Sequence, residues 1–421
     1  MKYSEICEVY EHLHKTSGRL DKIDILSDFL KKLRKGGRSE WIYLLRGKVL
    51  PDYDARVLGL SGKLAIKAIS KASGATSSEV VKIYNKIGDL GDVAEELFKN
   101  KKQSTLFSSK LTIEKVFNNF RKILEIEGRG AIDKKLALIV ELLNSASGVE
   151  AKYIVRTVIG TLRVGVADSS LRDAIAEAFF EKDKKEMANK IEDVYDLAND
   201  FALVFDAAIK GKKELDKVEI VPGKAMHVML PVKVTNIKEA FRICGKPAAI
   251  EHKYDGFRVV ISKHNNQIKL FTRRLDDVTN QFPDVVETIK KEVKGASFIL
   301  DSEVVGYDAK TKKYKPFEAI SQRIRRKYHI EKLIKELPVE VNVFDILYYN
   351  GKSLIEMQFK DRRKILEKAI KTKPFKIRTS KQFVTGDEKK AIKFYHDALD
   401  SGEEGIMMKK LDAPYKPGRR V

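Results

Sequence analysis

Glu251-His252-Lys253-Tyr254-Asp255-Gly256-Phe257-Arg258 is the stretch that decides the fold of the second half of this sequence. An apolar run at residues 248–250 precedes it, and a β-branched run at residues 259–261 follows it. Asp-Gly between two such runs is a strong turn signal. The pattern therefore predicts a strand, a tight turn and a second strand, with Lys253 at the mouth of the turn.

Lys253 has two interpretations. The simpler one is a solvated lysine beside an ordinary hairpin, because Lys-x-Asp-Gly is short enough to occur by chance. The other is a nucleophile. A free lysine side chain has a pKa near ~10.4, so it attacks only where neighbouring cations, a metal ion or desolvation favour the neutral amine. Its useful target would be the α-phosphate of a nucleotide, and that chemistry needs carboxylates for a metal ion and a pocket for base and sugar.

Length and charge narrow the function classes. The 421 residues are enough for two or three domains. Lysine and arginine number 82 against 60 acidic residues, a net charge of +22, which favours a polyanionic partner, nucleic acid ahead of a membrane surface. No apolar run could span a bilayer, and no signal peptide opens the chain. The two cysteines have no CxxC spacing, so we expect an intracellular protein without a disulfide framework or a structural zinc site.

Residues 1–215 show helical periodicity, as in the stripe Ile6, Val9, Tyr10 and Leu13, and predict one all-α domain of about a dozen helices. Three loops place glycines beside cations where backbone N–H groups could meet phosphates. A helix-ending glycine beside a surface arginine would explain any one of them, but three together favour binding to a nucleic-acid backbone. They are Arg46-Gly47-Lys48, Gly128-Arg129-Gly130 and Gly160-Thr161-Leu162-Arg163-Val164-Gly165.

The segment Lys101–Phe107 changes abruptly from polar to apolar. A tethering peptide anchored by Gln103, Leu106 and Phe107 would have this composition. The end of a buried loop would have it too, and the residues alone favour the loop.

The charged stretch Gly211–Lys217 is the best domain boundary, giving domains at residues 1–215 and 216–421. Past it the hydrophobic period shifts toward two, which predicts an α+β domain with a mainly antiparallel sheet. Asn265-Asn266 is expected to form a hairpin turn. The expected strands are residues 248–253, 258–263, 268–273, 298–305, 339–347 and 405–409, and the expected helices are residues 283–294, 328–337, 361–370 and 387–399.

The other parts of the lysine chemistry occur in these strands. Glu303 and Glu404 are carboxylates in apolar strand contexts, and Mg²⁺ prefers one or two carboxylates together with phosphates and waters. A lone carboxylate in a strand is usually paired or exposed, but two downstream of one candidate lysine favour a metal site. Arg258 and Arg273 could hold ribose or phosphate oxygens. Phe344 offers a ring for a base, although a core aromatic is the commoner use.

Five motifs in one order resemble the covalent nucleotidyltransferases, and most closely the ATP-dependent DNA ligases of archaeal and eukaryotic type. The third motif has serine where glycine is common in the family. The motifs are Lys253-Tyr254-Asp255-Gly256 with Arg258; Thr272-Arg273-Arg274; Leu300-Asp301-Ser302-Glu303; Phe344-Asp345-Ile346-Leu347-Tyr348; and Glu404-Gly405-Ile406-Met407-Met408-Lys409.

The first half resembles the same family. Tyr153-Ile154-Val155-Arg156, followed by the loop 160–165, is similar to its DNA-binding domain, which implies DNA contacts by Arg46, Lys48, Arg129, Gly130, Arg156 and Arg163. The segment Gln103–Phe107 resembles the sliding-clamp tether of archaeal ligases. The resemblance implies a cytoplasmic, nucleoid-associated monomer that acts on nicked duplex DNA in replication, repair and recombination.

The resemblance also implies a role for each residue of the site. Lys253 attacks the α-phosphate of ATP, Glu251 contacts the adenine amino group, and Phe344 stacks on the ring. AMP then passes to the 5′-phosphate of a nick, and the 3′-hydroxyl displaces it. Further nucleotide contacts are implied for Arg258, Arg273, Glu303 and Lys409, and Mg²⁺ or Mn²⁺ is implied at Glu303 and Glu404.

The family continues past Arg420 into a lysine-containing strand and an oligonucleotide-binding barrel, whereas this sequence stops at Val421. We therefore expect a truncated ligase in which lysine adenylation and nick sealing are severely weakened, while duplex binding partly survives. Three alternatives are kept open: an RNA ligase, a capping-type guanylyltransferase, and a clamp-tethered DNA-binding scaffold without activity. An NAD-dependent ligase is disfavoured because no four-cysteine zinc site is present.

Overall fold

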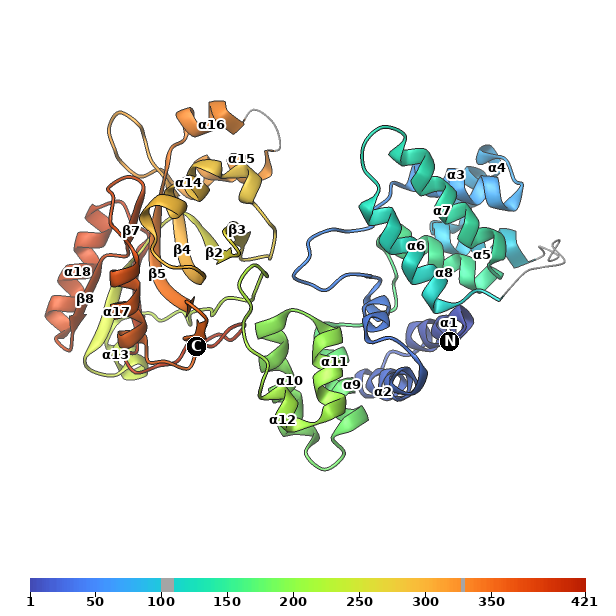
Figure 1. Cartoon of the computed structure of the whole chain (residues 1–421), viewed down its shortest axis with the longest axis horizontal. Helices are drawn as coiled ribbons and strands as arrows, with labels where there is room; N and C mark the ends of the chain where they lie inside the picture. The colour runs from blue at the N-terminus through green and yellow to red at the C-terminus, as the bar shows by residue number, and fades with distance from the viewer. Residues whose placement is uncertain (100–109, 327–329) are drawn as a thin grey trace. The chain divides into compact units, whose positions relative to one another are not determined.

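The computed structural model describes residues 1–99, 110–326 and 330–421, and these form two compact units (Figure 1). The first unit comprises Met1–Tyr195 and Asp200–Val218. The second comprises Asp196–Asn199 and Glu219–Val421. In the described part of the chain, no helix is both long enough and apolar enough to cross a membrane.

The first unit is helical over its described residues, as the hydrophobic periodicity predicts. Its only named elements are helices, apart from an isolated bridge between Lys2 and Thr112 in this described region. They are α1 (Tyr3–Lys15), α2 (Arg19–Gly36), the 3-10 helix η1 (Ser39–Arg46), α3 (Gly62–Ser73), α4 (Ser77–Ile87), α5 (Leu90–Lys99), α6 (Ile113–Glu125), α7 (Ala131–Ser145), α8 (Gly148–Val158), α9 (Asp168–Phe179), α10 (Lys184–Ala198), α11 (Phe201–Lys210) and α12 (Lys212–Leu215).

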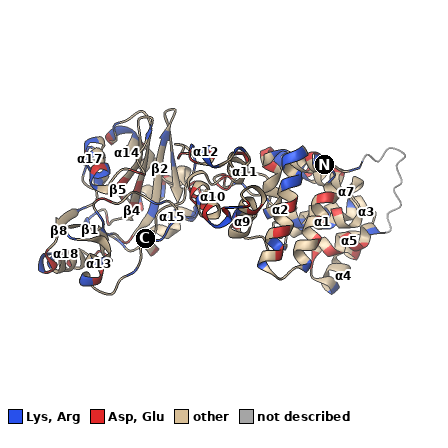
Figure 2. Cartoon of the chain, turned by 90° about the horizontal axis from the view of Figure 1, so that it is seen from below, with Lys and Arg blue, Asp and Glu red and all other residues tan. Residues whose placement is uncertain are grey.

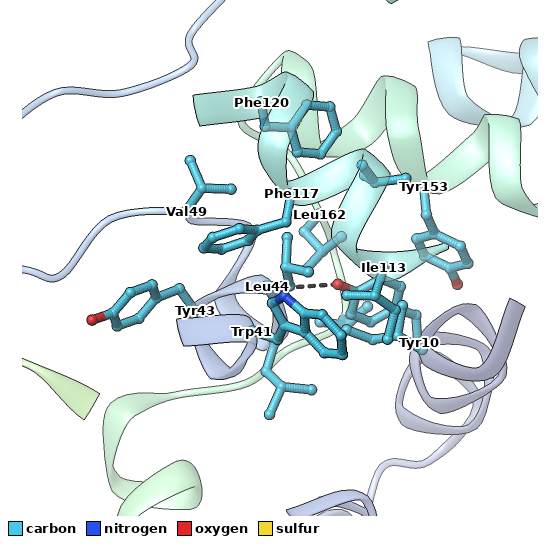
Figure 3. Close-up of a cluster of buried hydrophobic side chains, with 14 of the residues drawn as sticks. Tyr10, Trp41, Tyr43, Leu44, Val49, Ile113, Phe117, Phe120, Tyr153 and Leu162 are labelled. Atoms are coloured by element: carbon cyan, nitrogen blue, oxygen red, sulfur yellow. Dashed lines mark hydrogen bonds between the residues drawn. The ribbon is translucent and has the colours of Figure 1, made fainter. Parts of the chain in front are cut away.

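Aromatic side chains from helices far apart in the sequence form the core of this unit (Figure 3). Tyr10 and Tyr153 are buried and their ring centroids lie 4.8 Å apart, which joins α1 to α8. The Tyr10 hydroxyl donates to the backbone oxygen of Leu44, 2.8 Å away, so this buried phenol keeps a polar partner. Trp41, the single tryptophan of the sequence, is buried in the same core, so its fluorescence reports on the folding of this unit.

One ion pair at the α1–α8 contact gives a prediction about pH. Burial raises the pKa of Glu11, but hydrogen bonds from Lys152 and Tyr153 outweigh that effect and lower it to about 2. Glu11→Gln should therefore cost about 1–2 kcal/mol of unfolding free energy at pH 7, the range for a partly exposed charged hydrogen bond. Because the folded-state pKa lies below the ordinary value of 4.5, this stability is present above pH 4.5 and is lost as the pH falls toward 2. Unfolding followed by Trp41 fluorescence measures it, and Glu8→Gln at an exposed position of α1 is the control. An equal loss at pH 2 and pH 7 would contradict the assignment.

The second unit contains two sheets. The smaller has the strand order β8-β1-β9, with β1 (Ala248–Lys253), β8 (Gln382–Thr385) and β9 (Gly405–Lys409). The larger has the order β3-β2-β4-β5-β6, with β7 paired in parallel to β5 and every other pairing antiparallel. Its strands are β2 (Phe257–His264), β3 (Gln267–Thr272), β4 (Phe298–Gly306), β5 (Val339–Tyr349), β6 (Lys352–Ser353) and β7 (Ile377–Thr379).

Helices complete the second unit. α14 (Pro283–Glu292) and α17 (Phe359–Ala369) supply apolar residues to the core of the larger sheet, and α13 (Ile237–Cys244) and α18 (Glu388–Asp400) pack on the smaller one. The α+β prediction is confirmed. The remaining helices are η2 (Thr279–Gln281), α15 (Phe317–Arg325) and α16 (Ile330–Glu336).

The turn after Lys253 joins the two sheets. β1 ends at Lys253 and β2 begins at Phe257, but β1 pairs with β8 and β9, whereas β2 pairs with β3 and β4. The simpler interpretation of an ordinary hairpin is therefore wrong. The expected hairpin lies at Asn265-Asn266, where both residues have positive φ, 46° and 62°, between the antiparallel strands β2 and β3.

Strand alternation places the polar residues on one face of each sheet. Val259 and Ile261 point into the core of the larger sheet, so Arg258 points to the opposite face. Ile250 packs with Phe241 of α13 and Phe394 of α18, so its neighbours Glu251 and Lys253 lie on the other face of β1.

Candidate active site

Lys253 lies at the end of β1 and pairs with Glu404, the residue just before β9. The Lys253 ammonium contacts the Glu404 carboxylate, and the Glu404 backbone N–H donates to the Lys253 carbonyl at 2.9 Å. The two side chains are 38% and 53% exposed, so the pair is open to a ligand. This arrangement brings the predicted nucleophile and one predicted metal carboxylate together.

Gly256 is required by the close approach of the turn to β4. A Cβ atom at this position would overlap the carbonyl oxygen of Val304 and lie 3.1 Å from Cγ of Glu303. The turn can therefore press against the strand that carries Glu303 only because residue 256 has no side chain.

Gly256→Ala should lower the unfolding free energy of the second unit by about 1–3 kcal/mol, since the clash is with backbone rather than a flexible side chain. The turn would also move away from Glu303, so any activity of Lys253 should fall. Denaturation followed by circular dichroism measures the first effect. Gly386→Ala is the matched control, because its Cβ would meet only ordinary contacts at 3.6 Å and beyond. Equal effects of the two substitutions would contradict this explanation.

Glu251 forms a buried polar cluster with residues from three other elements. Its side chain is 2% exposed, and Lys409 and Gln382 donate to its two carboxylate oxygens at 2.7 and 2.8 Å. Arg363 of α17 lies 3.5 Å away. Gln382 and Arg363 were absent from the sequence predictions, because neither belongs to a recognisable motif and only the β1–β8 register places Gln382 opposite Glu251.

Phe344 of β5 has two cations of the site close to its ring. The Lys409 Nζ is 4.7 Å and the Arg258 guanidinium carbon 5.4 Å from the ring centroid. Met407 pairs directly with Glu251 across β1 and β9, so its half-buried side chain lies on the site face of β9. Aromatic and thioether surfaces beside a buried carboxylate suit a planar base.

Arg258 is fixed by a carboxylate that the predictions did not assign. Asp301 is fully buried on β4 and accepts from Nε and Nη2 of Arg258 at 2.9 and 2.5 Å. This bidentate geometry is the strong form of an arginine–carboxylate pair. Asp301 belongs to the same motif as Glu303. Because the two residues are two positions apart on β4, they lie on the same face, and strand alternation could not distinguish their roles.

Glu303 is the second predicted metal carboxylate. It pairs across the sheet with Arg258 on β2 and Asn342 on β5. The pKa of Glu303 is raised to about 8, chiefly by burial and also by the charges of Asp301 and Glu404, against the lowering effect of Arg258 and Lys253. The carboxyl therefore lies within electrostatic reach of both members of the Lys253–Glu404 pair.

The donor set fits a divalent cation that is also held by phosphates. No group of three or more His, Cys, Asp or Glu side chains suited to a metal ion occurs in the described residues. Mg²⁺ needs only one or two carboxylates when phosphates and waters complete its shell. A buried carboxyl with a raised pKa, near a second carboxylate, would be stabilised in its charged form by such a cation.

Arg273 is not brought into this cluster. It lies just past the end of β3 in an exposed turn, where the Thr272 hydroxyl accepts from the backbone N–H of Arg274 at 3.2 Å. Among the residues described, no hydrogen bond or ion pair joins Arg273 to Lys253, Glu303 or Glu404. Its nucleotide contact stays a prediction.

Two known protein families match separate parts of this chain. Residues 228–421 match the family described as "ATP dependent DNA ligase domain", and residues 2–176 match "DNA ligase N terminus". A DNA ligase of Nanoarchaeum equitans is 43% identical over all of this chain and 73% of its own length. This chain belongs to the ATP-dependent DNA ligases.

Other relatives agree with the assignment to the ligase family. A DNA ligase of Thermococcus fumicolans is 40% identical over the whole chain and 74% of its own length. A solved structure named "Pmar-Lig_Pre." aligns over 98% of this chain and 75% of its own, with a TM-score of 0.53 and 17% identity, which supports the fold alone. The chain thus spans about three quarters of these relatives.

In the helical unit of this ligase-family chain, the cations of the loop at residues 46–48 are paired with carboxylates. Arg46 contacts Asp52 and Asp168, and Lys48 also contacts Asp52. Figure 2 shows blue and red segments interleaved along the helices of this unit. A phosphate would therefore have to compete with these carboxylates for the same cations.

Arg156 has a different environment from the one expected. Its side chain is 3% exposed and donates to Asp89 at 3.1 Å and to Asp92 at 3.0 Å. In this conformation the guanidinium is not accessible to a phosphate, because two carboxylates hold it inside the α5–α8 contact. Arg163 is 55% exposed and lies 2.9 Å from Asp89, so Arg156 and Arg163 share one carboxylate. Arg156 thus holds the carboxylate that also pairs with the exposed Arg163, and DNA contact by either arginine stays a prediction.

The loop before α7 is open. Arg129 is exposed, and Gly130 caps α7 in a left-handed conformation, with φ of 78°. A Cβ at Gly130 would meet nothing within 4 Å, so only backbone conformation explains the glycine. The predicted clamp residues Gln103, Leu106 and Phe107 lie outside the described residues.

Proposed function

We propose that this chain seals nicks in duplex DNA by taking AMP from ATP onto Lys253 and passing it to the 5′-phosphate of the nick. The observation that carries this proposal is the position of Lys253 beside Glu404, on the same sheet face as the buried carboxylate Glu251. In the assignment that we propose, residues 216–421 carry the chemistry and residues 1–215 hold the duplex.

The first step forms a bond between Nζ of Lys253 and the α-phosphorus of ATP. The bond to the oxygen that bridges to the β-phosphate breaks, pyrophosphate leaves, and the amine loses its proton to solvent. In the second step a 5′-phosphate oxygen takes the AMP and Nζ is released. The 3′-hydroxyl then attacks the activated 5′-phosphate, loses its proton, and AMP leaves.

Each residue of the cluster has a task in this scheme. Glu251 accepts from the adenine amino group, while Lys409 and Gln382 hold its carboxylate in place. Phe344 and Met407 flank the base. Arg258 contacts the sugar or its neighbouring groups in an orientation fixed by Asp301.

Glu303 and Glu404 would hold a divalent cation, Mg²⁺ or Mn²⁺. When bound, such a cation neutralises charge on the phosphates and helps to orient them. Before it binds, the Glu404 carboxylate holds the Lys253 amine at the end of β1. The carboxylate must release the amine for the attack to begin.

Nucleotide labelling separates this function from its rivals. The chain is incubated with Mg²⁺ and ATP, GTP or NAD, each labelled in the transferred nucleotide. Label from ATP alone supports the DNA ligase. Label from GTP would indicate a capping-type enzyme, and absence of label from every donor would favour the inactive DNA-binding scaffold. Sealing of nicked RNA in preference to nicked DNA would favour the RNA ligase.

DNA binding should depend steeply on salt. If about six phosphates are neutralised, affinity for a nicked duplex should fall roughly a thousandfold between 50 and 200 mM salt. Fluorescence anisotropy measures it, with Arg129→Ala as a variant that should reduce the slope by about one charge. A shallow slope in the parent chain would contradict duplex binding by the basic helical unit.

We further propose that the chain works as a monomer in the cytoplasm at the nucleoid, in replication, repair and recombination. Gln103, Leu106 and Phe107 would tether it to a sliding clamp. Replacing Leu106 and Phe107 together by alanine should abolish co-elution with the clamp and leave DNA binding unchanged. If the double variant co-elutes with the clamp as fully as the parent chain does, the tether is contradicted.

A further inference from the structure

Tyr415 places a buried hydroxyl next to the arginine of the site. It lies shortly after β9 and the last of the motifs, and its side chain is 3% exposed. The hydroxyl donates to Oδ2 of Asp301 at 2.6 Å. It accepts from the Met229 backbone N–H at 3.0 Å and from Nη2 of Arg258 at 3.3 Å. A phenol has one donor and two acceptor positions, so all three are used.

The same network accounts for most donors of Arg258. Its Nε and Nη2 donate to Asp301, Nη2 also donates to Tyr415, and Nη1 donates to the Met229 carbonyl at 2.7 Å. A guanidinium has five N–H groups. Four are therefore directed at fixed partners in the described residues, and one N–H on Nη1 remains for a ligand.

The segment that carries Tyr415 is itself fixed. The Leu230 backbone N–H donates to the Arg419 carbonyl at 2.8 Å, and the Val421 backbone N–H donates to the Leu230 carbonyl at 2.9 Å. The segment after β9 thus lies beside the segment that carries Met229. Tyr415 and Met229 approach Arg258 together, and neither can move without disturbing the other.

We propose that Tyr415 is a positioning residue for nucleotide binding, whose hydroxyl orients the Arg258–Asp301 pair so that the remaining Arg258 N–H faces the nucleotide. This inference rests on the proposed function, in which Arg258 contacts the nucleotide. Without the hydroxyl, Asp301 loses a donor, the Met229 N–H loses its acceptor, and Nη2 of Arg258 is free to turn toward other partners. The Arg258 guanidinium can then adopt several orientations, and the one that faces the nucleotide is no longer preferred.

Binding of α,β-methylene-ATP, which cannot transfer its nucleotide, tests the proposal without requiring catalysis. Tyr415→Phe should weaken binding about tenfold, as expected for the loss of one charge-assisted hydrogen bond. In an Arg258→Ala background the same substitution should change binding less than about twofold, because no guanidinium remains to be oriented. A purely structural role would weaken binding equally in both backgrounds.

Tyr307→Phe is the matched control. Tyr307 is another buried tyrosine of this unit, and its hydroxyl donates to the Phe375 carbonyl at 3.2 Å, remote from Arg258. It should lower thermal stability without changing affinity for the analogue. Arg258→Lys, which keeps the charge but loses the bidentate geometry, is a second background in which Tyr415→Phe should have little effect.

The outcomes separate the two proposals. If the parent chain binds the analogue but takes no label from ATP, the lysine chemistry fails while the binding data still decide the role of Tyr415. If Tyr415→Phe binds as tightly as the parent, or is weakened equally in the Arg258→Ala background, the positioning role is overturned. Failure of the parent chain to bind the analogue overturns both.

Discussion

Lys253→Ala should abolish the transfer of AMP from ATP to the protein, with a loss of at least about a thousandfold, the scale seen when a covalent nucleophile is removed. Among the described residues, Lys253 is the only lysine that forms an ion pair with Glu404. Alanine lacks the amine, so no bond to the α-phosphorus can form. Incubation with α-labelled ATP and Mg²⁺, followed by gel electrophoresis and peptide mapping, measures the loss.

Lys246→Ala is the matched control for this experiment. Lys246 lies just before β1 and also pairs with a glutamate, Glu388, at 2.8 Å, with both side chains exposed. Its substitution should leave labelling unchanged, and the label of the parent chain should be released by acid, as expected for a bond between nitrogen and phosphorus. Undiminished labelling of Lys253→Ala, or label mapped to another residue, would refute the assignment.

Asp345→Ala should lower the unfolding free energy of the second unit by about 3–5 kcal/mol, because it leaves a buried arginine without its counter-charge. Asp345 of β5 accepts from Nε and Nη2 of Arg362 on α17 at 2.8 and 2.9 Å, and the two side chains are 4% and 1% exposed. The carboxylate also accepts from the Ile346 backbone N–H at 2.9 Å. Urea denaturation followed by circular dichroism measures the loss.

Two controls make the prediction specific. Asp361→Ala breaks an exposed pair with Lys364 on the same helix and should change the denaturation midpoint little, because solvent screens such pairs. Trp41 fluorescence reports on the first unit, whose unfolding should not change. If Asp345→Ala and Asp361→Ala behave alike, burial of the Asp345–Arg362 pair does not determine its contribution.

Asp345 also shows how a motif can be found for one reason and matter for another. The sequence singled out the Phe344-Asp345 motif because Phe344 offers an aromatic ring for a base. In the structure Phe344 faces the cations of the site, while Asp345 anchors α17 to the sheet. The motif alone predicted the role of Phe344. The role of Asp345 is explained only by its partner Arg362 on α17.

The sequence by itself determined the local features of this protein. Period-two alternation and the Asn-Asn and Asp-Gly turns located β1, β2 and β3, and helical stripes identified the first unit as all-α. These signals are local because a strand or turn is set by neighbours a few residues apart. The ordered motifs were sufficient to recognise the family.

Tertiary structure alone decided which sheet each strand joined and which side chains met. β1 and β2 are consecutive yet lie in different sheets, so Lys253 meets Glu404 and not a neighbour across a hairpin. Arg156 carries a surface-type charge yet is buried against Asp89 and Asp92. These contacts join residues more than sixty positions apart, so no local pattern encodes them.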